Sequence, residues 1–254
     1  MRMIYMKTFL KKDPGEEHNF WMSYTDLMSG FLIVFIIASV VATRDYQRKE
    51  RENAKVKHEL DSLHSSMRNL ISEFQFLSQQ VADDNSVDVK MVVNDERGSI
   101  QIYHKNPKEF LFPQQGKPEL PNEAMKLFLQ KYGKPIIEKT MSLATAYPNI
   151  ELRIEGHTDP SGFDGRQMYG SEESFLENMR LSTKRANEVY IFLYNDSGVG
   201  LEERHRSFLR NHAISLGYSF SERIKSNTHE MQHADEVLDN NSRRIEFRVI
   251  AKSK

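Results

Sequence analysis

The chain has 254 residues, with 35 lysines and arginines against 36 aspartates and glutamates. Because the charge is nearly balanced, the chain lacks the excess of positive charge that would indicate a nucleic-acid partner. It contains no cysteine, which excludes disulfide bonds and cysteine-ligated metals. One long apolar run lies near the amino terminus, and the remainder is polar with ordinary globular punctuation. We therefore expect one membrane segment, one connector and one soluble domain.

The apolar run at 20–42 follows a short tail, residues 1–19. It contains no Lys, Arg, Glu or His, and at about 1.5 Å per residue it is long enough to cross a hydrocarbon core of about 30 Å. A cleaved signal peptide is the alternative, because lysines precede the run and Val40-Val41-Ala42 resembles a cleavage site. The length of the run and the aromatic pair Phe20 and Trp21 favour a retained transmembrane helix.

One acid, Asp26, lies little more than a helical turn inside Trp21. An ionisable side chain costs roughly 2.5–3.5 kcal/mol at the centre of a membrane helix, and less near its end. One interpretation is that Asp26 reaches back to the interface or caps the helix. The other is that it faces a protein interior and binds and releases an ion, with the hydroxyls of Tyr24, Thr25 and Ser29 along the path.

The stretch WMSYTDLM, residues 21–28, resembles the single transmembrane helix of MotB-type stator subunits, in which the aspartate carries the translocated ion. The resemblance implies that Asp26 binds a proton or Na⁺, with the proton favoured because the segment offers few other oxygen ligands. It also implies a single-pass protein of the bacterial inner membrane, with a cytoplasmic amino terminus and a periplasmic carboxy-terminal domain. Basic residues flank the run on both sides, so charge does not decide the orientation.

The connector, residues 43–85, carries apolar residues at alternating spacings of four and three. They are Val56, Leu60, Leu63, Met67, Leu70, Phe74, Leu77 and Val81. This heptad pattern predicts a coiled-coil linker that joins two copies of the chain in a dimer. A single amphipathic helix packed on the chain's own soluble domain is the alternative.

The soluble domain, 86–254, alternates predicted strands and helices, which indicates an α/β sandwich with helices on one face of a small sheet. A hairpin is expected at 87–104, strands at 150–156 and 243–250, and helices from Asn122 to Ala146, at 175–194 and at 201–211. Gly133 and Pro135 are expected to kink the first of these helices.

The order of GHTD at 156–159, NMRLSTKRANEV in the following helix, SLGYS and a terminal RRIEFRVI resembles the OmpA C-terminal peptidoglycan-binding domain over about residues 86–252. The resemblance implies that Asp159 and Arg185 hold the diaminopimelate of the cell-wall peptide, aided by Thr158 and Asn178. An acid and an arginine suit the ammonium and the carboxylate of an amino-acid head group. The alternative is that the two residues only tie the loop to the helix.

Three features depart from these patterns or compete with them. The connection at 160–177 is longer than is usual in the OmpA-like family, and Ser242 stands where Asn commonly precedes the terminal arginine pair. His229-Glu230-Met231-Gln232-His233 matches the zinc-protease pattern H-E-x-x-H, but it lies in a polar connection without an evident third ligand, so we expect no metal and no enzymatic activity.

The combined resemblance is nearest to the MotB-like subunit of the Zorya anti-phage defence system. It implies an ion-driven stator subunit that is anchored to peptidoglycan and assembled with a MotA-like multi-span subunit, a ZorA-like pentamer. No cofactor is expected beyond the translocated ion. The alternative from another class is a passive OmpA-like cell-wall anchor that moves no ions.

Overall fold

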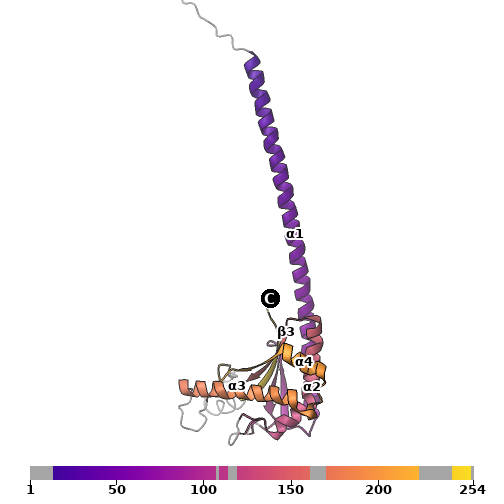
Figure 1. The fold of residues 1–254 in the computed structure, drawn as a ribbon, viewed down its shortest axis with the longest axis vertical. Coiled ribbons are helices and arrows are strands. Elements are labelled where there is room, and N and C mark those ends of the chain that lie inside the picture. Colours follow the sequence, from indigo (N-terminus) through magenta and orange to yellow (C-terminus); the bar gives the residue numbers. More distant parts are fainter. Residues whose placement is uncertain (1–13, 107–108, 114–118, 161–169, 223–241, 253–254) are drawn as a thin grey trace, which may run out of the picture. The chain divides into compact units, whose positions relative to one another are not determined.

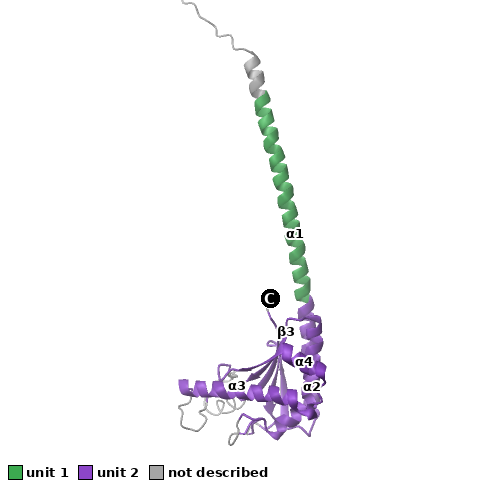
Figure 2. Cartoon of the chain, viewed as in Figure 1, with its two compact units in different colours: residues 1–61 green, residues 62–254 purple. Residues whose placement is uncertain are grey.

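The computed structural model describes residues 14–106, 109–113, 119–160, 170–222 and 242–252, with side chains from Met22 onward. The chain divides into two compact units, residues 1–61 and 62–254 (Figure 2). The first contains most of one long helix. The second is an α/β domain that also includes the end of that helix.

Helix α1 runs from Pro14 to Asp83 without a break (Figure 1). Its apolar side chains between Met22 and Val41 are exposed, as expected for a surface that another medium or protein must cover. By length and composition this helix is apolar enough to cross a membrane.

The second unit is built on a five-stranded sheet. The strands are β1 (Val89–Asn94), β2 (Ser99–His104), β3 (Ile150–Gly156), β4 (Ala213–Gly217) and β5 (Ile245–Ala251), in the order β1-β2-β5-β3-β4. β3 and β4 are parallel, and the other neighbours are antiparallel. Four of these strands were predicted, whereas β4 was not.

The two faces of the sheet differ because successive side chains of a strand point to opposite sides. One face carries the apolar residues of the core, including Ile100, Ile102, Leu152, Ile154, Phe247 and Val249. The other carries charged residues, among them Glu155 opposite Glu246 and Arg153 opposite Arg248. The apolar face is the one that the helices cover.

The helices of this unit are α2 (Glu123–Ala146), α3 (Glu172–Asn195) and α4 (Glu203–His212), with a short turn of 3-10 helix, η1 (Ser197–Val199). Asn122 caps α2 by accepting a hydrogen bond from the amide of Met125 at 2.9 Å. α2 stays one helix through Gly133 and Pro135. All three helices supply buried residues to the core, so the predicted α/β sandwich is confirmed.

The end of α1 belongs to this core. Four residues of the heptad pattern, Leu70, Phe74, Leu77 and Val81, are at most 4% exposed there. This is the alternative that the sequence left open, and the compact unit accordingly begins at Ser62 rather than at residue 86. Val56 and Leu60 are exposed, so pairing with a second helix remains a prediction for the earlier part of the connector.

Two phenylalanines near the end of α1 allow a test of how this helix packs on the core. Phe74 is 1% exposed and Phe76 is 65% exposed. We expect Phe74→Ala to lower the free energy of unfolding of the domain by about 3–5 kcal/mol, because it leaves a cavity in the core. Phe76→Ala should change it by less than about 0.5 kcal/mol. Pulse proteolysis of the purified chain in increasing urea measures both, and equal effects would contradict this packing.

Candidate functional site

The first candidate site is the side of α1 around Asp26. Met22, Ser23, Thr25, Asp26 and Ser29 line one open recess on the helix surface. The Ser29 hydroxyl donates a hydrogen bond to the backbone carbonyl of Asp26 at 2.8 Å. Its hydroxyl oxygen can still accept a hydrogen bond from another group.

Tyr24 is not part of this recess. At about 100° per residue, Tyr24 lies about 200° around the helix from Asp26, whereas Thr25 lies about 100° away. Of the three predicted hydroxyl residues, Thr25 and Ser29 line this recess with Asp26.

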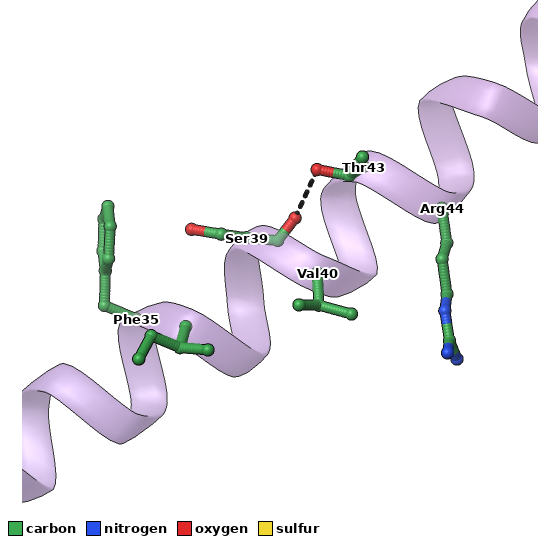
Figure 3. A pocket seen from close by; sticks show the side chains of 6 residues that line it. Phe35, Ser39, Val40, Thr43 and Arg44 are labelled. Atoms are coloured by element: carbon green, nitrogen blue, oxygen red, sulfur yellow. Dashed lines mark hydrogen bonds between the residues drawn. The ribbon is translucent and has the colours of Figure 1, made fainter.

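The far end of the apolar run shows how polar groups are accommodated there. Figure 3 shows Phe35, Ser39, Val40, Thr43 and Arg44 projecting from α1, with the Thr43 hydroxyl bonded to the carbonyl oxygen of Ser39 at 2.8 Å. Such a bond satisfies a hydroxyl within its own helix, as an apolar medium requires. Asp26 differs, because a carboxylate brings a charge that no such bond removes.

The second candidate site lies where β3 ends. The amide of His157 donates to the carbonyl oxygen of Arg244 at 3.0 Å, and the amide of Thr158 donates to that of Ser219 at 2.9 Å. These bonds hold the GHTD loop between the start of β5 and the loop after β4. They place Asp159, which is 5% exposed, beside α3 and the start of β5.

Asp159 forms an ion pair with Arg243, whose Nη2 lies 2.6 Å from Oδ2 of the acid. Arg243 was predicted only as the start of the last strand, because the arginine pair before β5 does not itself indicate a partner for Asp159. Arg185 projects from α3 into the same region, with its guanidinium 4.9 Å from the ring centroid of Phe112. The guanidinium of Arg243 lies 4.5 Å from the ring centroid of Phe110.

The electrostatics of Arg185 reflect this crowded position. Burial, together with repulsion by Arg243, lowers the pKa of Arg185 to about 10, and attraction by Asp159 and Glu119 opposes the shift. Arg185 therefore stays protonated at neutral pH and can bind an anion. The site offers one carboxylate and two guanidinium groups against two aromatic rings, which suits a ligand that carries both charges.

The two remaining predicted residues are buried. Asn178 is 6% exposed and donates to the hydroxyl of Ser174 at 3.3 Å, and Ser174 donates to the carbonyl oxygen of Pro160 at 2.9 Å. Thr158 is 2% exposed, and its hydroxyl has no hydrogen-bond partner among the described residues. Ser174 thus ties α3 to the loop after Asp159, Asn178 bonds to Ser174 within the helix, and Thr158 places a hydroxyl in the GHTD loop.

A third group of ionisable residues lies on the charged face of the sheet. Ligand atoms of Glu155, His157 and Glu222 lie within 4.8 Å of one another, a spacing that a metal ion could bridge. However, Arg248 donates to Glu155 at 2.6 Å and Arg97 binds Glu222. Guanidinium groups already hold both carboxylates, which favours a network of ion pairs over a metal centre.

Two predictions fall on other segments. The HExxH residues, 229–233, and half of the lengthened connection, 161–169, lie outside the described residues. Within the described part of the connection, the amide of Gly170 donates to the carbonyl oxygen of Pro160 at 3.0 Å, and Ser171 caps α3.

Taken together, the described residues define a class of protein: one helix long enough to span a membrane with an acid in its apolar part, and an α/β domain with a buried cluster of one acid and two arginines. Along nearly its whole length the chain is similar to the Zorya protein ZorB of Escherichia coli ATCC 8739, with 25% identity over 252 residues that cover 98% of this chain and 94% of that protein. The predicted resemblance is thereby confirmed. No protein-family model matches the chain.

Solved structures similar to the chain include MotB-type proteins. A MotB-like protein from Desulfovibrio vulgaris aligns with a TM-score of 0.40 and 15% identity, covering 76% of this chain and 97% of that one. The periplasmic domain of Helicobacter pylori MotB aligns with a TM-score of 0.37 and 15% identity, covering 61% of this chain and 76% of that one.

Proposed function

We propose that the chain is a stator subunit of a Zorya-type anti-phage system, in which the α/β domain anchors an ion-driven membrane complex to peptidoglycan. The observation that carries the proposal is the similarity to ZorB, because it extends over 98% of the chain and so includes the apolar helix and the domain in one order. The pocket at the end of β3 supports the anchoring part.

In this function Asp159 receives the ammonium of diaminopimelate, and Arg185 receives its carboxylate through a bidentate contact. In the structure the Asp159 carboxylate pairs with the Arg243 guanidinium at 2.6 Å. The ammonium of the ligand must therefore share this carboxylate with Arg243 or displace Arg243 from it. Thr158 and Asn178 contribute neutral hydrogen bonds to the same head group.

Asp26 is the ion-binding residue of the proposal. Loading with a proton neutralises the carboxylate, and a partner that surrounds the helix can respond to the change of charge. A single helix cannot enclose an ion path, so the complex needs a multi-span MotA-like partner, a ZorA-like pentamer around a dimer of this chain. The domain then lies in the periplasm and the amino terminus in the cytoplasm, with one span in the inner membrane.

The competing function is a passive cell-wall anchor, which needs the span and the pocket but not Asp26. Affinity purification of the full chain from its native membrane separates the two functions. We expect a multi-span partner to co-purify in stoichiometric amount, and we expect the complex to sediment with purified sacculi. Sedimentation with sacculi in the absence of any multi-span partner would favour the passive anchor.

A further inference from the structure

Helix α3 touches the ends of two strands through its backbone. A Cβ atom placed on Gly156, the last residue of β3, would lie 2.1 Å from the carbonyl oxygen of Ser182. A Cβ atom on Gly217, the last residue of β4, would lie 2.4 Å from the amide nitrogen of Thr183. Only glycine permits this approach at both positions, so the helix and the strand ends are fixed directly against each other.

This contact lies close in sequence to two of the residues proposed to bind peptidoglycan. Asp159 follows Gly156 by three residues, and Arg185 follows Ser182 by three residues on the same helix face. The ammonium and the carboxylate of an amino-acid head group are a short, fixed distance apart. A pocket that binds both must therefore keep its acid and its arginine at a constant separation.

Ser219 joins the two sides of the contact. Its amide donates to the hydroxyl of Ser182 at 3.0 Å, and its hydroxyl donates to the carbonyl oxygen of Phe175 at 2.9 Å. Its own carbonyl oxygen accepts the amide of Thr158 at 2.9 Å. One residue thus links the GHTD loop to α3 at two points that are two turns apart.

The backbone of Ser219 is unfavourable for a serine. Within the described part of the chain it is the one residue other than glycine with a positive φ, 51°, and it is fully buried. Glycine adopts this conformation without a steric penalty, so the backbone alone would favour glycine here. The hydrogen bond from the hydroxyl to Phe175 explains why a serine rather than a glycine is found at this position.

We propose that Ser219 is a positioning residue that holds Thr158 and Asp159 at a fixed distance from Arg185. The proposal rests on the proposed binding of diaminopimelate by that pocket. Ser219 itself makes no contact with the ligand in this account. Two of its three hydrogen bonds are made by its backbone and remain in any variant, so the side chain acts through the hydroxyl bond to Phe175 on α3.

The test is to measure binding and stability separately in the full chain. We expect Ser219→Gly to weaken binding of free diaminopimelate by roughly 3- to 10-fold, the effect of losing one hydrogen bond. Its midpoint of unfolding should stay the same or rise, because glycine relieves the positive φ. Ser219→Ala should lose as much affinity and also some stability. Ser221→Ala is the matched control, since the exposed Ser221 hydroxyl donates to the carbonyl oxygen of Tyr218 within its own turn.

The possible results separate a failure of the positioning role of Ser219 from a failure of the proposed peptidoglycan site. Native affinity in Ser219→Gly would overturn the positioning role of the Ser219 hydroxyl and leave the proposed binding site intact. A parallel fall in affinity and stability in Ser219→Gly would also overturn it, because it would show a purely structural residue. No binding of diaminopimelate by the wild-type chain would overturn the proposed function of the pocket, and the positioning role with it.

Discussion

Asp159→Asn is expected to reduce retention of the full chain on purified sacculi by roughly 10- to 100-fold, as expected for the loss of a charged hydrogen-bond partner. The substitution keeps the shape of the side chain but removes the charge that an ammonium requires. It also removes the negative charge that pairs with Arg243 at 2.6 Å, so the positive charges of Arg243 and Arg185 are no longer offset by the acid.

The matched control is Asp88→Asn, because Asp88 is an exposed acid of the same domain. It should leave retention unchanged. Arg185→Lys tests the other half of the pocket, because lysine keeps the charge and loses the bidentate geometry. Unchanged retention in Asp159→Asn would refute the assignment of this pocket to peptidoglycan.

Asp26→Asn is expected to abolish the activity of the complex while membrane insertion and retention on sacculi stay at wild-type level. Asparagine has nearly the same size as aspartate, but it cannot take up and release a proton. In cells the measurement is protection against phage, accompanied by fractionation of the membranes.

Ser39→Ala provides the control within the same helix. Ser39 is a polar residue of the apolar run that lies thirteen positions from Asp26, and its carbonyl oxygen, not its side chain, receives the Thr43 hydroxyl. Activity should persist in this variant. Full activity in Asp26→Asn would favour the passive anchor.

Much of the domain could be predicted because its elements carry local signals. The alternation of IELRIEG predicted β3, and Asn122 marked the start of α2 through its side-chain cap. β4 escaped prediction because its five residues follow α4 directly, with no turn residue between them. A short strand that pairs only with a distant segment gives little local signal.

The heptad pattern shows a different limit. An apolar stripe predicts that one face of a helix is covered, but it does not specify the surface that covers it. From Leu70 to Val81 that surface is the core of the domain. The same limit applies to the charged face of the sheet, where Glu155 and Glu246 are fully buried although alternation alone would place them in solvent.

The charged cluster at the end of β3 combines predicted residues with contacts that could not be predicted. Asp159 and Arg185 lie at one site, but the ion pair of Asp159 with Arg243 depends on β5 pairing beside β3, which brings together residues 84 positions apart. The contact of Arg185 with Phe112 likewise joins α3 to a loop far away in the sequence. Neither contact has a local sequence signal.

The central claim, that Asp26 couples ion flow to a wall-anchored complex, is tested most directly by proton flux. The chain and its multi-span partner would be reconstituted in liposomes with an imposed pH gradient. We predict flux through the wild-type complex and none through the Asp26→Asn complex, which should assemble equally well. Equal flux through both complexes would contradict the claim.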